Sequence, residues 1–177
     1  MNKATNQFSF LVLFILSIFL SQFGCDKGGD KSSSSGESCL PAANQIIFQA
    51  ENGTGSGQVK SRSNADGKET VWVHADESRT IPFTLCPGNS TRYRIRVRYS
   101  NDNFGPLEVV SLQLDGSSVG QFIAEDTGDY GLGWNNFTES SVPGPITLNP
   151  GDHKITILVN GGDGNGIEID SIILDRI

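Results

Sequence analysis

The chain has 177 residues, of which 36% are hydrophobic and 19% are charged, and its formal net charge is −7. This length suits one domain preceded by a leader segment. The acidic balance argues against nucleic-acid binding, because contacts with phosphate need a basic surface.

The N-terminus has the pattern of a secretory signal. Lys3 precedes an apolar run over residues 8–20, which is too short to span a bilayer comfortably. We therefore expect residues 1–24 to be a signal peptide and the protein to be secreted or extracellular. Removal of this segment changes the net charge to −8, because Lys3 is its only charged residue.

The chain contains three cysteines, Cys25, Cys39 and Cys86. Cys25 follows Gly24 at the end of the signal, as does the lipidated cysteine of bacterial lipoproteins, although Gln22 stands where those signals carry an aliphatic residue. A lipid on Cys25 would be the protein's only contact with the membrane and would anchor it at the cell surface. Cys39 and Cys86 then remain to form a disulfide in an oxidising compartment.

Three possible glycosylation triplets, which begin at Asn52, Asn89 and Asn136, allow a second interpretation of the source. The chain would then be a eukaryotic secreted protein without a lipid. Such triplets also arise by chance in β proteins rich in Asn and Thr, so the sequence leaves both sources open.

The composition changes after the leader. Residues 26–37 carry no apolar side chain, and we expect residues 25–43 to form a flexible tether. From residue 44 to residue 177, short apolar runs alternate with turn residues, and no segment has a helical stripe. We expect this range to form one folded domain.

The clearest element covers residues 91–100, where Tyr93, Ile95, Val97 and Tyr99 alternate with four arginines. This period of two predicts a central antiparallel strand with one face in the core. The arginine face is either a solvated surface balanced by carboxylates on neighbouring strands or a cationic stripe for acidic polysaccharide.

Further strands are predicted where similar runs lie between turns. Pro82 must lie at an edge or a bulge, because it has no amide hydrogen to donate. The expected strands are residues 45–50, 69–75, 79–86, 107–115, 119–124, 134–140, 146–148, 154–160 and 167–174. Nine or ten short strands without helical crossovers predict an all-β domain, a β-sandwich of jelly-roll type.

Five segments of this domain together resemble a known family. They are residues 48–51, 93–101, 133–137, 148–153 and 166–174, in this order. The segments resemble carbohydrate-binding modules of families 6 and 35, which share a galactose-binding-like jelly roll. The resemblance covers residues 44–177.

The resemblance implies a structural calcium site. In these families the first and last strands lie side by side and hold the ion, which would place Gln49, Glu51 and Asp170 as side-chain ligands. Ca²⁺ takes six to eight oxygen ligands, and two carboxylates, one amide and backbone carbonyls can supply them. The alternative is that Glu51 and Asp170 are ordinary acids at turns or edges.

The resemblance also implies a sugar site between Trp72 and Trp134, the only two tryptophans. An indole offers a wide, rigid surface for the apolar face of a pyranose. Asn165 would bond the sugar, with Asp163 as a second candidate or as a ligand of a second calcium ion, and Tyr130 would form a third wall. The alternative is that one or both tryptophans fill the core.

These observations predict a non-catalytic, monomeric module that binds polysaccharide or glycan. The sequence contains no Gly-x-Ser-x-Gly or His-Glu-x-x-His motif and only two histidines, so we do not expect an enzyme. The alternative is an extracellular adhesion or scaffold domain of the same fold that binds a protein partner. Exposed tryptophans would favour the sugar, and buried ones the scaffold.

Overall fold

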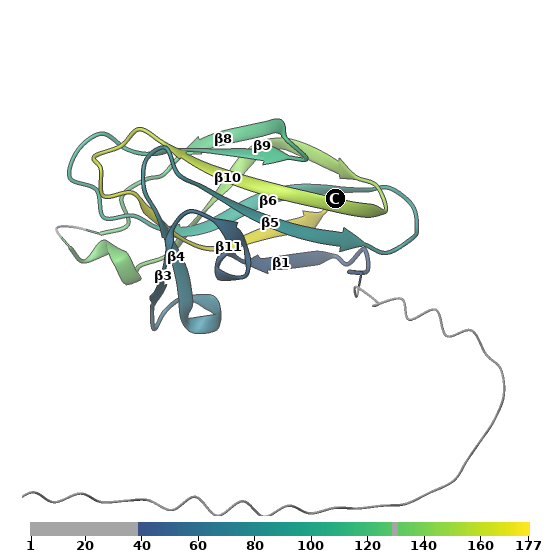
Figure 1. Cartoon of the computed structure of the whole chain (residues 1–177), viewed down its shortest axis with the longest axis horizontal. Coiled ribbons are helices and arrows are strands. Elements are labelled where there is room, and N and C mark those ends of the chain that lie inside the picture. The colour runs from purple at the N-terminus through teal and green to yellow at the C-terminus, as the bar shows by residue number, and fades with distance from the viewer. Residues whose placement is uncertain (1–38, 129–130) are drawn as a thin grey trace, which may run out of the picture. The chain divides into compact units, whose positions relative to one another are not determined.

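The computed structural model describes residues 39–128 and 131–177, which form a β-sandwich of two antiparallel sheets (Figure 1). The six-stranded sheet has the order β3-β4-β11-β6-β9, and β1 pairs with β11 as well. Its strands are β1 (Gln45–Gln49), β3 (Gln58–Ser61), β4 (Glu69–Val73), β6 (Thr91–Ser100), β9 (Thr138–Leu148) and β11 (Ile167–Arg176). The predicted jelly-roll sandwich is confirmed.

The five-stranded sheet has the order β2-β5-β10-β7-β8. Its strands are β2 (Thr54–Gly55), β5 (Ser78–Leu85), β7 (Val109–Leu114), β8 (Ser117–Ile123) and β10 (Gly151–Asn160). Pro82 lies beyond the two residues of β5 that pair with β2, so β5 has only β10 as its strand neighbour at that position. The prediction that Pro82 lies at an edge is confirmed.

β6 has the predicted register. Tyr93, Ile95, Val97 and Tyr99 are fully buried in the core between the sheets. On the opposite face, Arg96 pairs with Glu139 of β9 and with Asp175 of β11. This pairing supports the interpretation of the arginine face as a surface balanced by carboxylates.

Several elements differ from the prediction. The segments expected at 134–140 and 146–148 form one strand, β9, which begins only at Thr138, and Trp134 lies in a short 3-10 helix, η3 (Gly133–Asn135). The short strands β2 and β3 were not predicted, because each offers at most one apolar side chain to an alternating pattern. Two further 3-10 helices, η1 (Ala50–Asn52) and η2 (Asp66–Lys68), follow β1 and precede β4.

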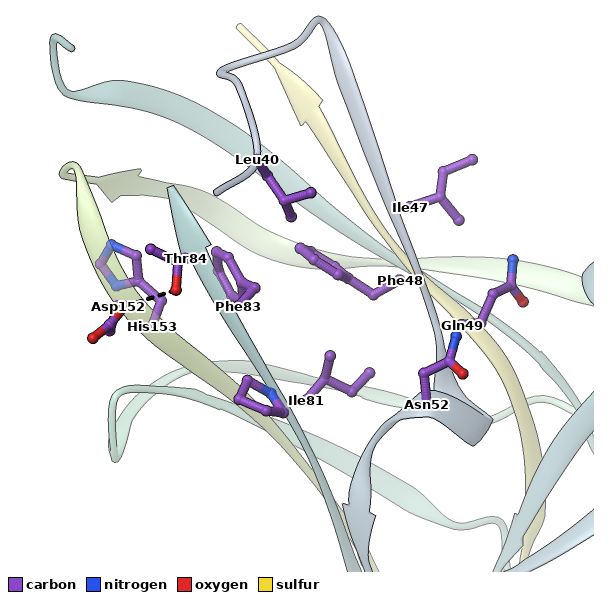
Figure 2. Close-up of a pocket in the computed structure, with 11 residues that line it drawn as sticks. Leu40, Ile47, Phe48, Gln49, Asn52, Ile81, Phe83, Thr84, Asp152 and His153 are labelled. Atoms are coloured by element: carbon purple, nitrogen blue, oxygen red, sulfur yellow. Dashed lines mark hydrogen bonds between the residues drawn. The ribbon is translucent and has the colours of Figure 1, made fainter. Parts of the chain in front are cut away.

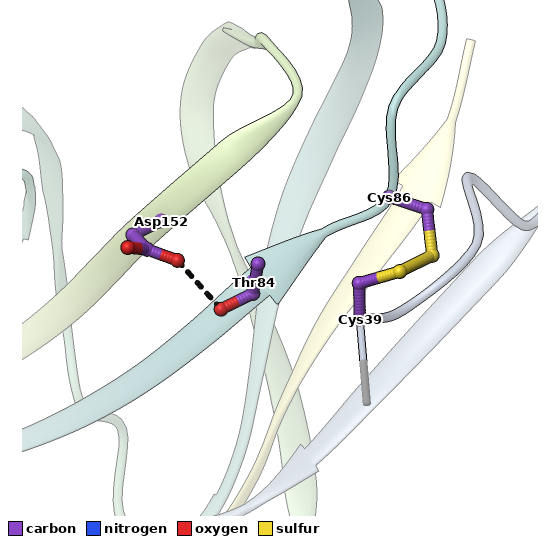
Figure 3. The surroundings of a disulfide bond; sticks show 4 residues. All are labelled: Cys39, Thr84, Cys86 and Asp152. Carbon is purple, nitrogen blue, oxygen red and sulfur yellow. Dashed lines mark hydrogen bonds between the residues drawn. A yellow bond between two sulfur atoms is a disulfide. The ribbon is translucent and has the colours of Figure 1, made fainter. Parts of the chain in front are cut away.

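The predicted disulfide is present between Cys39 and Cys86, whose Cα atoms lie 4.9 Å apart (Figure 3). Beside it, Leu40 donates its amide hydrogen to the Thr84 carbonyl at 2.8 Å and accepts one from Cys86 at 2.9 Å. These contacts fix residues 39 and 40 of the expected tether to β5. The expected signal peptide and Cys25 lie outside the described residues.

No helix within residues 39–128 and 131–177 is both long and apolar enough to cross a membrane.

Candidate functional site

A pocket of about 330 Å³ lies at the loop end of the six-stranded sheet. Both tryptophans and Asn165 contribute to its wall, so the structure brings three of the predicted ligand residues together. The complete lining is Lys60, Arg62, Trp72, Asp102, Phe104, Gly131, Trp134, Asn165 and Glu168. We call this cavity the tryptophan pocket.

Trp72 lies on β4 between two valines, Val71 and Val73, that are fully buried in the core. Alternation along the strand therefore turns the indole to the outer face of the sheet, as predicted, where it is half-buried. Its Nε1 donates to the Asn165 carbonyl at 2.5 Å, and the Lys60 ammonium lies 4.6 Å from the ring centroid. The ring is thus held on one side by the loop before β11 and is in contact with a cation.

Trp134 is half-buried, and its ring centroid lies 6.0 Å from that of Trp72 at an angle of 69°. The backbone beside Trp134 is closely packed. Gly133 leaves no room for a side chain, since a Cβ there would come within 2.3 Å of the Asn101 carbonyl oxygen. Thr127 Oγ1 donates to the Gly133 carbonyl at 3.0 Å and Ser100 Oγ to the Trp134 carbonyl at 3.3 Å. Neither tryptophan belongs to the core between the sheets.

Asp163 does not line the pocket but orders the loop that carries Asn165. Its carboxylate accepts hydrogen bonds from the backbone amide of Asn165 at 2.7 Å, from Asn165 Nδ2 at 2.9 Å and from the Phe104 amide at 2.6 Å. Partial burial raises the pKa of Asp163, but these hydrogen bonds outweigh it and hold the pKa below its usual value. Tyr130 lies outside the described residues.

Sequence reasoning missed the charged part of the pocket. Glu168 is 1% exposed and accepts from Arg62 Nε at 2.7 Å, from Arg62 Nη2 and from Thr70 Oγ1 at 3.0 Å. Its place on β11 opposite Trp72 follows from strand pairing, which the sequence alone does not supply. Asp102 is fully buried and belongs to no motif that sequence reasoning used.

A second polar cluster lies where β1 ends beside β11. The register of β11 against β6 shifts between Ile169 and Ser171, so Asp170 stands at a β-bulge. On the other edge of β11, β4 pairs up to Ile169 and β1 pairs from Ser171 onward, and Asp170 lies at the junction of the two. Asp170 is fully buried.

The three predicted metal ligands lie around this junction, and each has a buried oxygen without a hydrogen-bond partner. These atoms are Gln49 Oε1, Glu51 Oε2 and Asp170 Oδ1. Gln49 and Glu51 also approach Gly67 of η2, since a Cβ there would lie 3.6 Å from Gln49 Oε1 and 3.3 Å from Glu51 Oε1. Because buried polar atoms are normally satisfied, three such oxygens in one region need an explanation.

The charges of this cluster are only partly balanced. Burial raises the pKa of Glu51, and the neighbouring charge of Asp170 raises it further. Burial also raises the pKa of Asp170, against hydrogen bonds that its Oδ2 accepts from the Asp66 amide at 3.2 Å and from Arg98 Nη1. In the described part of the chain no three His, Cys, Asp or Glu side chains form a metal-binding group, so any cation here would depend on the amide oxygen of Gln49 and on backbone carbonyls.

A larger cavity of about 620 Å³ opens between β1 and β5 (Figure 2). Figure 2 shows Phe48 and Phe83 side by side in its wall, and their ring centroids lie 4.7 Å apart. The complete lining is Leu40, Ile47, Phe48, Gln49, Asn52, Ile81, Pro82, Phe83, Thr84, Asp152 and His153. We call this cavity the inter-sheet pocket.

Comparison with known proteins gave one family and several related structures. A family model described as delta endotoxin matches residues 43–177. No match was found among curated proteins.

Among solved structures, a family 35 carbohydrate-binding module from Clostridium thermocellum is 21% identical with a TM-score of 0.60, and the match covers 75% of this chain and 98% of the module. A carbohydrate-binding module from Cellvibrio mixtus lichenase 5A in complex with cellotriose is 22% identical with a TM-score of 0.58, over 75% and 97%. The predicted resemblance to modules of families 6 and 35 is thus confirmed for the fold.

An exo-β-1,3-galactanase from Phanerochaete chrysosporium with galactose is 24% identical with a TM-score of 0.58. The match covers 75% of this chain but only 29% of the galactanase, so the chain corresponds to less than a third of that enzyme.

Proposed function

The chain belongs to the delta endotoxin family over residues 43–177, and from the jelly-roll fold and the tryptophan pocket we propose that it binds carbohydrate without catalysing a reaction. The observation that carries the proposal is the position of Trp72 and Trp134, the only two tryptophans, in one pocket outside the core. The modules in the comparison that bind sugars share the fold and support the same function.

The chemistry of the pocket suits a sugar. A pyranose has an apolar face that packs on an indole and an edge of hydroxyls that needs hydrogen-bond partners. The pocket offers two indoles and several polar side chains in a volume at the low end of the usual range for ligand sites. Stacking contributes on the order of 1 kcal/mol per aromatic platform, so a single site of this kind has a dissociation constant of roughly micromolar to millimolar.

The two tryptophans have different roles in this proposal. Lys60 lies over the Trp72 ring, and the indole nitrogen is already bonded to Asn165. Trp72 is therefore the fixed wall, and Trp134 is the platform on which the sugar stacks. Asn165 contributes its side-chain amide, which is oriented by the hydrogen bond that its Nδ2 donates to Asp163.

The absence of catalysis is part of the proposal and rests on the carboxylates. Glycoside hydrolysis needs two carboxyl groups that are free to act on either side of the bond. Two carboxylates line the tryptophan pocket, but both oxygens of Glu168 are bonded to Arg62, and one of them also to Thr70. Only Asp102 keeps an oxygen without a partner.

We also propose that Gln49, Glu51 and Asp170 hold a structural Ca²⁺. The three oxygens without partners, together with the pKa values that burial raises, fit the ligand set of a cation. When bound, the ion would neutralise the two carboxylates and join the first and last strands of the domain. A location outside the cytosol agrees with the Cys39–Cys86 disulfide, which suits an oxidising compartment.

The test of sugar binding is a glycan array with the wild type and Trp134→Ala. We expect the substitution to abolish binding with little change in melting temperature, because the side chain lies outside the core. Leu132→Ala is the matched control, since Leu132 is 72% exposed, is close in sequence and does not line the pocket. A Trp134→Ala protein that unfolds, or one that keeps its glycan binding, would contradict the proposed site.

A further inference from the structure

Asp102 lines the tryptophan pocket, and the rest of the protein does not satisfy all the hydrogen-bonding capacity of its carboxylate. It lies two residues after Ser100, the last residue of β6, and is fully buried. Its Oδ1 accepts a hydrogen bond from the Gly131 amide at 2.9 Å, and its Oδ2 has no hydrogen-bond partner. A buried carboxylate oxygen without a donor is energetically unfavourable, and a hydrogen-bond donor on a bound ligand would remove this cost.

Neither cation of the pocket forms an ion pair with Asp102. Arg62 forms its ion pair with Glu168, and Lys60 lies over the Trp72 ring. Among the described residues, no ion pair involves Asp102, and the Gly131 amide is the one donor to its carboxylate. The buried carboxylate therefore keeps its charge and one acceptor oxygen unpaired in the wall of the pocket.

The position of this carboxylate is fixed by close packing. A Cβ at Gly133 would approach the Asp102 Cβ to 2.9 Å, so the backbone before Trp134 lies directly against Asp102. Two residues after Asp102, Phe104 forms another part of the pocket wall, and its amide is bonded to Asp163. Asp102 is thus rigidly placed between the chain segments that carry two aromatic walls.

We propose that Asp102 sets the ligand class of the site: its Oδ2 accepts a hydrogen bond from a hydroxyl of the bound sugar and selects neutral glycans over uronate-containing or sulfated ones. This inference rests on the proposed carbohydrate binding. A hydroxyl supplies the donor that Oδ2 lacks, and a hydrogen bond to a buried charge is among the stronger ones. A ligand carboxylate or sulfate offers no donor and is repelled by a like charge in a poorly solvated pocket.

The test compares the wild type with Asp102→Asn on neutral and anionic probes. Cellotriose and β-1,3-galactotriose represent neutral glycans on an array, and trigalacturonate and sulfated galactans represent anionic ones. We expect the wild type to bind neutral probes only, and Asp102→Asn to lose roughly tenfold or more in affinity for the best neutral probe. The same variant should gain relative affinity for the anionic probes.

Asp152→Asn is the matched control, because it removes the same charge from an exposed site outside this pocket. A series of monodeoxy derivatives of the best neutral probe identifies the hydroxyl: one derivative should bind the wild type weakly and lose nothing further with Asp102→Asn. This series needs only the wild type if Asp102→Asn fails to fold.

The outcomes separate the two proposals. Three results would overturn the inference and leave carbohydrate binding intact. They are sugar binding that does not change with Asp102→Asn, a wild-type preference for anionic probes, and a deoxy series in which every derivative binds as well as the parent sugar. A wild type that binds no glycan at all overturns both.

Discussion

The two pockets differ in whether the aromatic residues in their walls belong to the hydrophobic core. The inter-sheet pocket is nearly twice as large, but Phe48, Ile81 and Phe83, which line it, are at most 8% exposed and belong to the core. The tryptophan pocket is smaller, and the indoles in its wall are half-buried and lie outside the core.

The polar groups of the two pockets differ as well. In the inter-sheet pocket, Thr84 donates to Asp152 at 2.7 Å (Figures 2 and 3), and both ring nitrogens of His153 have partners. Gln49 Oε1 also lines this pocket and has no partner, but it belongs to the cluster with Glu51 and Asp170. In the tryptophan pocket, Asp102 keeps an oxygen without a partner. The comparison teaches that an unsatisfied carboxylate beside half-buried indoles outside the core marks a binding site better than volume does.

The strongest test of this difference between the pockets is to truncate one aromatic side chain in each. We expect Phe83→Ala to lower the free energy of unfolding by about 3–5 kcal/mol, because it removes a core ring that packs on Phe48. The folded fraction should bind glycan as the wild type does. Denaturant unfolding and titration calorimetry measure the two effects, and Trp134→Ala should show the opposite pattern. If Phe83→Ala stays stable and loses the ligand, the inter-sheet pocket is the binding site.

The disulfide beside the inter-sheet pocket should have the next largest effect on stability. The bond closes a loop with a sequence separation of 47 residues, and chain entropy predicts that it contributes about 4 kcal/mol. We expect Cys39→Ser/Cys86→Ser to lose this amount in denaturant unfolding while the folded protein keeps its glycan affinity. Cys25→Ser is the control, since that cysteine takes no part in the bridge. An unchanged unfolding midpoint would show that residues 39 and 40 are held by other contacts.

The sequence predicted the fold well where alternation is strict. β6 was predicted residue for residue, because four core side chains alternate with four arginines. Trp72 was placed on the outer face for the same reason. Alternation failed for Trp134, which lies in a 3-10 helix rather than a strand, at a point where Gly133 packs closely against Asn101.

The site was predictable only in part, because its remaining residues are brought together by pairing between distant strands. Glu168 faces the pocket because β11 pairs with β4, and Arg62 reaches it from the loop after β3, a strand that the sequence did not reveal. Asp102 has no local signature, since its importance lies in a missing hydrogen bond. Missing partners are a property of the packed structure alone.

The calcium proposal predicts a stability change that depends on pH. With 100-fold excess of free Ca²⁺ over the dissociation constant, the folded state should gain about 2.7 kcal/mol. Glu51 and Asp170 have raised pKa values, so in chelator their contribution to stability is present below their ordinary pKa and is lost as the pH rises through the raised values. The calcium effect on melting temperature should therefore grow from about pH 4 to pH 7.

Asp170→Asn should remove this sensitivity to calcium. Asp175→Asn is the control on the same strand, because Asp175 lies outside the cluster and pairs with Arg96. The difference between melting curves with calcium and with chelator cancels the other carboxylates, such as Asp163, whose lowered pKa acts in the opposite direction. Identical curves under both conditions at pH 7 would refute the site.

The smallest expected effect belongs to His153, in the wall of the inter-sheet pocket. Burial lowers the pKa of His153, but the Asn149 carbonyl and Asp115 outweigh it and raise the pKa above its usual value. Its contribution to stability is present below the usual value near 6.5 and is lost as the pH rises through the raised pKa. Burial likewise raises the pKa of Asp115, but hydrogen bonds from His153 and Lys154 hold it below its usual value, so that its contribution is lost in acid.

The pair should therefore stabilise the fold most between about pH 4 and pH 6.5. Since Asp115 is 46% exposed, we expect His153→Asn to cost less than about 1 kcal/mol at pH 5.5 and still less at pH 8. Thermal unfolding at the two pH values measures this, with Asp126→Asn as a control that leaves the pair intact. Glycan affinity should not change with this substitution at either pH, because His153 lines the other pocket. A loss of affinity would mean that the two pockets are coupled.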